Sequence, residues 1–374
     1  MTRALRLGRI FGIDIEIDYT WFIIFFLVAA GLSSGWFAKY LPDMSLGARW
    51  LIAAFTTVLF FASVLLHELS HSLVAIRNGL NISGITLFLF GGVSKMTEEP
   101  RSAGAEFKIA IAGPVTSMML AAVFLIAARF LKGAAGGNVL GTVFLWLGYV
   151  NGMLAVFNLL PGFPLDGGRV LRAGLWKGLM NLSEATRIAA TFGQGLGILM
   201  IIGGIFLFFG GAGLGGLWLA FIGWFLIQAA QSSYRQLVLR QALSGVPVST
   251  VMSGEVDWVP AEITLDQVVH EYVMGRNHPA FPVLDGDVVL GLLCLNDIRG
   301  VPRENWSRTT AREAVPALTD QFTIAPSTDA WDALVRMTAE NCGRLLVLED
   351  GQLRGIVSRT DIMRLMRTRL ELGV

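Results

Sequence analysis

The chain has 374 residues, of which 54% are hydrophobic and 15% charged, and its mean hydropathy is +0.61. Such an apolar composition excludes an ordinary water-soluble enzyme and predicts a membrane protein that carries a soluble part. The formal net charge of +1 gives no reason to expect nucleic acid as a partner.

The first two thirds of the chain are a series of apolar segments. Residues 13–18 alternate strictly between isoleucine and acidic residues, which predicts a strand with one apolar face. Each apolar segment that follows approaches the ~20 residues that a ~30 Å hydrocarbon core requires. We therefore predict six transmembrane helices, at about 19–37, 50–76, 107–131, 139–160, 189–210 and 214–232.

The second predicted helix contains His67, Glu68 and His71. Four positions are close to one helical turn, so the two imidazoles share a face and Glu68 can reach a water between them. This spacing is typical of metalloprotease zinc sites, in which the Glu is the general base. A carboxylate at membrane depth costs roughly 2.5–3.5 kcal/mol on insertion scales, and a metal site would explain that cost. The alternatives are a chance pattern and a metal or proton transporter.

Residues 82–96 separate the second and third predicted helices and are rich in β-branched and aromatic residues. The glycine pair at 91–92 interrupts them, which predicts a short β-ribbon rather than a helix. Irregular backbone near the membrane is tolerated where it is buried in protein or lines a wet cavity. The ribbon edge could hold an extended substrate by strand addition. A connecting ribbon without substrate remains equally open.

A catalytic zinc normally takes three protein ligands, so the histidine pair needs a third partner. Asp166 is the best candidate, because it is a lone carboxylate in segment 158–169, between prolines and a glycine pair. Prolines stop the preceding helix and glycines permit close backbone approach. Asp is also favoured as a helix cap. On spacing alone, both roles stay open.

Lysine and arginine predominate on one side of the predicted helices, which predicts that both termini are cytoplasmic. The histidine pair then lies in the cytoplasmic half of its helix. The basic residues on the cytoplasmic side would be Arg3, Arg6, Arg9, Arg77, Lys95, Arg101, Lys108, Arg169, Arg172, Lys177 and Arg187.

The polar C-terminal third contains an internal repeat with a constant offset of 64 residues. For example, residues 283–285 (VLD) recur as 347–349 (VLE), and Asp297 recurs as Asp361. Each copy reads as a mixed α/β unit, and two copies are expected to bury a face against each other. Cys294 and Cys342, the two cysteines, form no disulfide framework, which favours a reducing compartment.

The histidine motif together with segment 158–168 resembles the site-2 protease family of intramembrane zinc metalloproteases, over about residues 1–232. The resemblance implies one Zn²⁺ per chain, held by His67, His71 and Asp166, with Glu68 activating the water. It also implies that Asn158 assists the substrate or the developing oxyanion.

A glycine–proline pair in the third helix of that family is matched here by Gly113 and Pro114. Where many members carry an asparagine three residues after the proline, this chain has Ser117. No role is assigned to Ser117 on the sequence.

The repeat resembles a pair of CBS domains, the family named after cystathionine β-synthase. In the second copy Ser358, Thr360 and Asp361 match the segment that contacts adenine nucleotides such as ATP or AMP. In the first copy Cys294 replaces the hydroxyl residue, so a site there is doubtful. A dimerisation module without ligand is an equal alternative for the pair, and a homodimer through these domains is expected.

The sequence thus predicts a membrane α-helical protease domain (1–243) followed by a soluble α/β tandem of CBS domains (246–305 and 306–374). The expected activity is hydrolysis of a peptide bond in or near the transmembrane segment of a single-span membrane protein, as in regulated intramembrane proteolysis. The expected location is the plasma or inner membrane of a prokaryote, with the lipid bilayer as surroundings. The alternative is a nucleotide-gated, zinc-binding transporter or receptor without protease activity.

Overall fold

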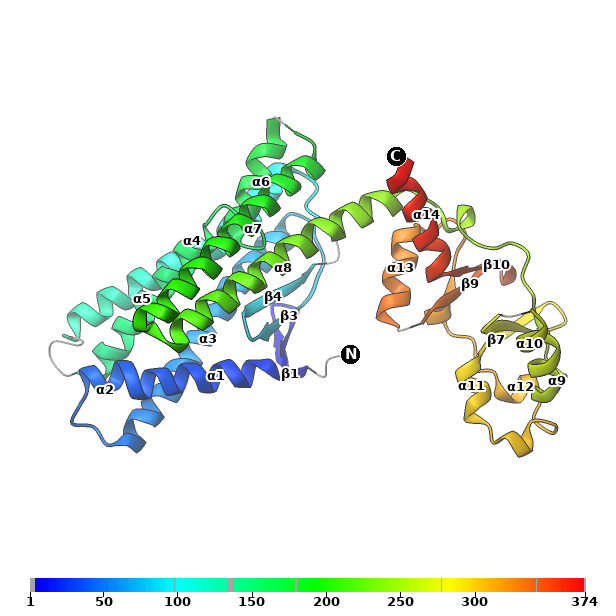
Figure 1. Cartoon of the computed structure of the whole chain (residues 1–374), viewed down its shortest axis with the longest axis horizontal. Coiled ribbons are helices and arrows are strands. Elements are labelled where there is room, and N and C mark those ends of the chain that lie inside the picture. The colour runs from blue at the N-terminus through cyan, green and yellow to red at the C-terminus, as the bar shows by residue number, and fades with distance from the viewer. Residues whose placement is uncertain are drawn as a thin grey trace. The chain divides into compact units, whose positions relative to one another are not determined.

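The computed structural model of the chain describes residues 4–96, 99–132, 138–178, 180–276, 278–340 and 342–372 (Figure 1). It divides into two compact units, Met1–Arg235 and Gln236–Val374. The division falls inside helix α8 (Leu214–Leu243), whereas the sequence suggested a change of character near residue 243. The domain boundaries given above remain predictions.

The first unit is built from long apolar helices. Six helices in the described part of the chain are long and apolar enough to cross a membrane, which confirms the expected number. The first combines α1 (Thr20–Gly31), a π-helical turn η1 (Leu32–Trp36) and α2 (Phe37–Tyr40). The others are α3 (Leu46–Arg77), α4 (Ala103–Phe130), α5 (Val139–Asn158), α7 (Leu182–Leu207) with the π-helical turn η2 (Phe208–Ala212), and α8.

Polar side chains begin most of these helices. Ser45, Ser102, Asn138 and Asn181 each accept a hydrogen bond from a backbone N–H of the first turn. Such caps satisfy donors that have no partner within the helix. A shorter helix, α6 (Asp166–Gly178), lies between α5 and α7 in the chain.

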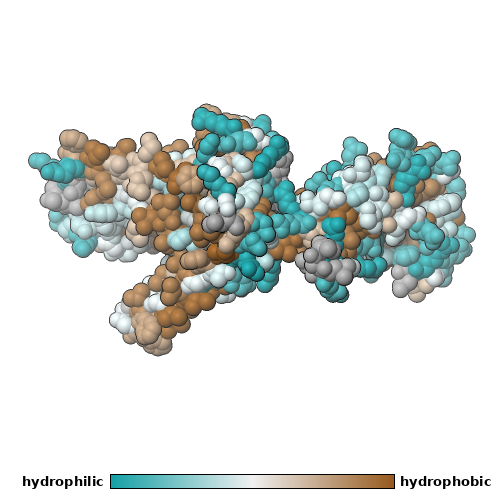
Figure 2. Space-filling model, turned by 90° about the horizontal axis from the view of Figure 1, so that it is seen from above, coloured by the Kyte–Doolittle hydropathy of each residue, from teal (hydrophilic) through white to brown (hydrophobic). Residues whose placement is uncertain are grey.

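The outer surface of the helical unit is apolar. Phe130, Leu51 and Phe206 are 82%, 76% and 75% exposed. Figure 2 shows hydrophobic residues over much of the visible surface of these helices. A soluble protein would not leave contiguous apolar surface of this kind in water. The chain is a multi-pass membrane protein.

A four-stranded sheet packs against α3. Its strands are β1 (Leu5–Ile10), β2 (Ile13–Ile17), β3 (Ile82–Phe88) and β4 (Gly91–Met96), in that order. The β3–β4 pair is the predicted ribbon and β2 is the predicted strand; β1 was not predicted. Strands β2 and β3 are parallel, with Ile15 opposite Ile85. Both isoleucines are buried with Ile13 and Leu69, the last of which belongs to α3.

The second unit contains two copies of one α/β arrangement, as predicted. In each copy a parallel strand pair is followed by an antiparallel partner, β5–β6–β7 in the first and β8–β9–β10 in the second. Leu346 of the second copy is fully buried against Ala280, Val289 and Leu292 of the first, so the copies share a core. The strands are β5 (Val259–Pro260), β6 (Ala280–Asp285), β7 (Val288–Cys294), β8 (Thr323–Ile324), β9 (Arg344–Glu349) and β10 (Gln352–Ser358).

Short helices complete both copies. Before residue 306 these are η3 (Val248–Thr250), α9 (Leu265–Gln267), the π-helical η4 (Val268–Val273), α10 (Met274–Arg276), α11 (Leu295–Gly300) and η5 (Arg303–Asn305). Although η3 comes first in the chain, its Val248 is buried in the core of the second copy, with Ile324 and Leu345. Those that follow are α12 (Ala311–Ala314), η6 (Asp320–Phe322), α13 (Ala330–Ala339) and α14 (Arg359–Leu372).

Candidate metal centre

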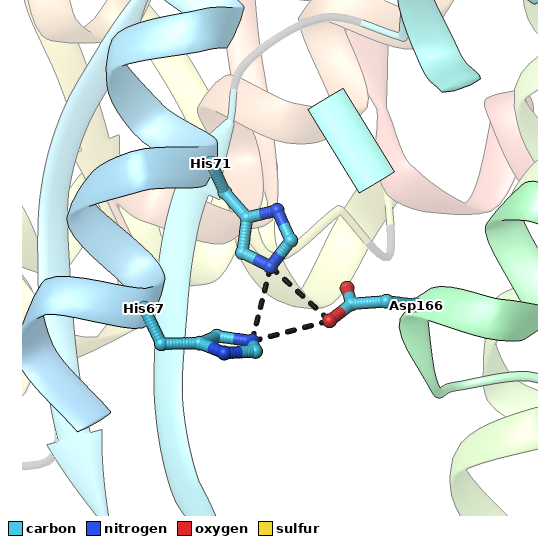
Figure 3. A group of neighbouring side chains, drawn as sticks. All are labelled: His67, His71 and Asp166. Atoms are coloured by element: carbon cyan, nitrogen blue, oxygen red, sulfur yellow. Dashed lines mark hydrogen bonds and ion pairs between the residues drawn. The ribbon is translucent and has the colours of Figure 1, made fainter. Parts of the chain in front are cut away.

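Three of the predicted site residues converge on one point. His67 and His71 project from the same face of α3, and Asp166 reaches toward them from the first residue of α6 (Figure 3). The two Nε2 atoms are 3.1 Å apart, and Asp166 Oδ2 lies 3.1 Å from His67 Nε2 and 3.2 Å from His71 Nε2. The histidines are 3% and 5% exposed, so the group is largely shielded from water.

The second ring nitrogen of each histidine has its own partner on α4. His71 Nδ1 lies 2.6 Å from the carbonyl oxygen of Ile109. A carbonyl only accepts, so Nδ1 of His71 carries the proton and the lone pair of a neutral ring is at Nε2. His67 Nδ1 lies 2.8 Å from Ser117 Oγ, which is fully buried. These contacts fix the orientation of both rings, as partners of metal-ligating histidines do.

The donor set fits a zinc ion. Rings that are neutral and protonated at Nδ1 would direct two Nε2 lone pairs and the Asp166 carboxylate at one another, and a cation between them would stabilise that arrangement. Tetrahedral zinc with bonds of about 2.0–2.1 Å places its ligand atoms roughly 3.3 Å apart. The observed separations of 3.1–3.2 Å among the three atoms are close to that spacing. Two imidazole nitrogens and one carboxylate oxygen also match a catalytic zinc set, which leaves a fourth position open.

Gly113 provides the room for this group. A Cβ at this position would lie 2.1 Å from His71 Nε2 and 2.5 Å from His67 Nε2, far inside van der Waals contact. Only glycine lets α4 approach the two rings so closely. The next residue, Pro114, lies inside the helix and has no backbone N–H to donate.

The loop before Asp166 is packed tightly against α7. A Cβ on Gly193 of α7 would lie 1.9 Å from the carbonyl oxygen of Phe163, and one on Gly162 would lie 2.6 Å from Gly193 Cα. Gly168, just after Asp166, similarly lies against the backbone of the loop, where a Cβ would be 2.4 Å from Phe163 N. The glycines therefore allow the close backbone contacts that bring the carboxylate to the histidines.

Glu68 faces strand β4. Ser94 Oγ donates a hydrogen bond of 3.2 Å to Glu68 Oε2, and Ser94 also bonds to Ser72 Oγ at 3.0 Å. A Cβ on Gly92 would lie 2.4 Å from Glu68 Cγ, so the strand needs glycine here. The ribbon thus forms one wall beside the predicted general base.

The side chain of Asn158 bonds to the backbone of its own helix, whereas a group that binds substrate would be expected to point into the site. Its side-chain nitrogen donates a 3.1 Å hydrogen bond to the carbonyl oxygen of Leu154, one turn earlier in α5. Its role toward substrate remains a prediction. Asp166 is the first residue of α6, and its carboxylate faces the two histidines, so its role as a metal ligand remains a prediction that this position supports.

Ser117 and the Ile109 carbonyl are the partners that sequence reasoning did not identify. A signal was present for Ser117, because it follows Gly113 by four positions and so shares its helix face. The Ile109 contact depends on a backbone carbonyl, which no sequence pattern identifies. Ser94 lies inside the predicted ribbon, but the sequence did not indicate which face of the strand its side chain would occupy.

In the second unit, Ser358 and Asp361 interact with each other at the start of α14. Asp361 Oδ2 accepts hydrogen bonds from Ser358 N at 3.1 Å and from Ser358 Oγ at 2.5 Å. Cys294 N donates in the same way to Asp297 Oδ2, at 2.8 Å, in the first copy. Thr360 is exposed. These contacts are those of helix caps, and a nucleotide site at Ser358, Thr360 and Asp361 remains a prediction.

Known proteins share both parts of the chain. The model of Peptidase family M50 matches residues 55–140 and 132–202, and the CBS domain model matches residues 248–304 and 313–368. Rip3 of Mycobacterium tuberculosis, named as a zinc metalloprotease, is 36% identical over 98% of this chain and 93% of its own length. Zinc metalloprotease MJ0392 of Methanocaldococcus jannaschii is 31% identical over 98% of this chain and 97% of its own length.

A solved structure, the site-2 protease from M. jannaschii, is 36% identical and covers 62% of this chain and 96% of that one, with a TM-score of 0.44. The relatives Rip3 and MJ0392 match nearly the whole chain, the membrane unit and the repeat together. The chain therefore belongs to Peptidase family M50, the site-2 proteases, as a zinc metalloprotease with a C-terminal pair of CBS domains.

Proposed function

We propose that this protein hydrolyses a peptide bond in or near the transmembrane segment of a membrane protein, with zinc held by His67, His71 and Asp166. The observation that carries the proposal is the triangle of Nε2, Nε2 and Oδ2 atoms, 3.1–3.2 Å on each side. Both Nδ1 atoms are already engaged on α4, so the Nε2 atoms are the ones available to a metal.

The depth of the site supports a substrate in the membrane. The histidines lie within α3, a 32-residue helix that qualifies as a membrane span and ends at Arg77. The transmembrane segment of a single-span protein already places peptide bonds at this depth in the bilayer. Basic residues near this end of α3 favour the cytoplasmic side, and with it cytoplasmic termini in a prokaryotic plasma or inner membrane.

Zinc bound at the three ligands would supply a Lewis acid and lower the pKa of its water toward ~7. The carboxylate of Glu68 takes the proton of the attacking water and passes it to the nitrogen of the leaving amine. The hydroxyl of Ser94, 3.2 Å from Glu68 Oε2, holds that carboxylate in place. Asn158 would help stabilise the developing oxyanion after its amide turns away from Leu154 O.

The edge of β4 is the proposed binding surface for the substrate backbone. Among the described residues, strand β4 is the last strand of its sheet and pairs with β3 on one edge, so its other edge is the one at which a further strand could add. A substrate helix has to unwind before hydrolysis, because its carbonyls are engaged within the helix. An unwound segment could add to β4 as a further strand, and Ser94 on that strand is in contact with Glu68.

The decisive experiment compares Glu68→Gln with the parent protein after reconstitution with a single-span substrate. We expect the variant to keep its zinc and to lose cleavage by at least 10²-fold, in line with the usual contribution of a general base. Ser83→Ala is the matched control, because Ser83 lies on the neighbouring β3 and its hydroxyl donates to the carbonyl oxygen of Lys95 and not, among the described residues, to Glu68. Cleavage by Glu68→Gln at the parental rate would exclude the proposed role. A chain that transports zinc but cleaves nothing would favour the transporter reading.

The CBS pair is the proposed regulatory element. An adenine nucleotide bound at Ser358, Thr360 and Asp361 would have to displace the cap that Asp361 now forms with Ser358. A nucleotide that binds one packing of the CBS pair more tightly than another, typically by ~1–3 kcal/mol, would shift the equilibrium between the two packings. Calorimetry of the full chain with ATP and with AMP tests this, and Asp361→Ala should abolish any heat. A homodimer through the pair can be checked by the mass of the detergent-solubilised protein.

A further inference from the structure

A buried ion-pair cluster connects the elements that carry the metal centre. Glu106 of α4 is completely buried, and its Oε1 accepts a 2.5 Å hydrogen bond from Arg172 Nε. Arg172 Nη2 also contacts Glu106 Oε1 and donates to Glu99 Oε2 at 3.1 Å. Arg172 itself is 4% exposed, so the guanidinium and the Glu106 carboxylate meet away from water.

Arg172 is located where it can fix the position of Asp166. It lies six residues after Asp166 in α6, about 9 Å along the helix axis. Its guanidinium also stacks over the ring of Phe163, at 5.1 Å, in the loop that leads to Asp166. The partner Glu106 stands in the first turn of α4, the helix whose later turns carry Gly113 and Ser117. One guanidinium therefore contacts α4, the loop before Asp166 and the segment that follows β4.

The physics of such a pair favours a role in geometry over one in stability. Desolvation of two charges offsets most of their attraction, so a buried pair adds little net stability. Removal of Arg172 leaves the buried Glu106 carboxylate with the more distant Arg169, whose Nε lies 3.9 Å from Glu106 Oε1, so the carboxylate has to rearrange. The planar fork of arginine also restricts the angle at which a carboxylate can bind. An ion pair of this kind holds two helices in one arrangement.

We propose that Arg172 is a positioning residue: by binding Glu106 it holds α6 against α4, so that the Asp166 carboxylate stays within ligating distance of the two histidines. This inference rests on the proposed role of Asp166 as a metal ligand. Among the described residues, the polar contacts of Arg172 run to Glu106 and Glu99, so on this view it acts on the metal centre only through the position it gives to Asp166.

Zinc affinity of the full chain in detergent, measured by competition with a chromogenic chelator, tests the proposal. We expect Arg172→Met to weaken zinc binding by 10–100-fold, the usual effect of removing a group that orients a ligand. Glu106→Gln should act in the same direction and keeps the side-chain shape, so it serves if Arg172→Met does not accumulate. Arg6→Met is the matched control, because Arg6 pairs with Asp14 at an exposed site of the same unit and should keep parental affinity.

A double-variant cycle separates positioning from general damage. In an Asp166→Ala background, Arg172→Met should change zinc affinity by less than 3-fold, because the residue through which it acts is gone. An equal loss in both backgrounds would mean that the variant damages the unit as a whole and would overturn the proposal, as would parental affinity of Arg172→Met and Glu106→Gln. If Asp166→Ala alone keeps parental affinity, the ligand role of Asp166 fails first, and the inference fails with it.

Discussion

The replacement of Gly113 by alanine should remove zinc while leaving the fold nearly unchanged. The added methyl group would lie 2.1 Å from His71 Nε2 and 2.5 Å from His67 Nε2, where an ordinary contact needs more than 3.4 Å. Because both rings are held at Nδ1 by α4 itself, neither can withdraw without breaking a hydrogen bond. The methyl group therefore occupies space that the ligands and the metal require.

The magnitudes favour a loss of affinity over a loss of stability. Alanine is favoured over glycine within a helix by ~0.8–1 kcal/mol. Overpacking of a buried site typically costs about 1–3 kcal/mol, so the net change in the free energy of unfolding should be small. Displacement of the ligand atoms should lower zinc affinity by ~10–100-fold or more, by analogy with the loss of orienting groups.

The assay is zinc content after dialysis, together with cleavage of a reconstituted substrate and thermal unfolding in detergent. Gly104→Ala is the control, because Gly104 lies in the same helix and a Cβ there meets nothing within 4 Å. We expect the control to match the parent in zinc content and cleavage, and to unfold at the same temperature or slightly above it, because alanine is the better helix former. Parental zinc content and cleavage in Gly113→Ala would refute the reasoning, because the rings would then have to move freely.

Three further outcomes are expected. Ser117→Ala should weaken zinc binding by about 10-fold by freeing the His67 ring, measured by chelator competition, whereas Ser117→Asn should retain most of it, because an amide can also bond Nδ1. Treatment with 1,10-phenanthroline should stop cleavage, and added zinc should restore it; activity that persists in the metal-free protein would contradict a zinc mechanism. Burial raises the pKa of both the Cys294 and the Cys342 thiols, so the folded chain holds less thiolate near pH 8 than the unfolded chain. Iodoacetamide should therefore label the folded chain more slowly than the chain in denaturant, and the ratio of the two labelling rates should approach one as the pH rises.

Local pattern was enough to predict much of the fold. Apolar runs of sufficient length gave the six helices, and the alternation at 13–18 gave β2. Strand β1 was missed because all six of its residues are exposed, so no buried face imposes an alternation. The parallel pairing of β2 with β3 was also beyond the sequence, since it joins segments that are far apart in the chain.

The site was predictable where spacing within one element decides the geometry. His67 and His71 share a helix face by their separation alone, and the loop chemistry around Asp166 suggested a carboxylate as the third ligand. The partners of these residues depend on how α4 packs against α3, which no local pattern encodes. Asn158 illustrates the same limit, because the side to which its amide turns is set by its surroundings and not by its position in the motif.

The pairing of β2 with β3 also constrains how the chain is threaded through the bilayer. Asp14 stands opposite Gly84, and two spans, Thr20–Tyr40 and Leu46–Arg77, lie between them. Strands that are hydrogen-bonded to each other must lie on the same side of the bilayer, so the chain has to cross the membrane out and back between β2 and β3. During synthesis the sheet can close only after both spans have been inserted. If the first span were inserted in the opposite direction, β2 and β3 would lie on opposite sides of the membrane and could not pair, so the sheet forms only in a correctly inserted chain.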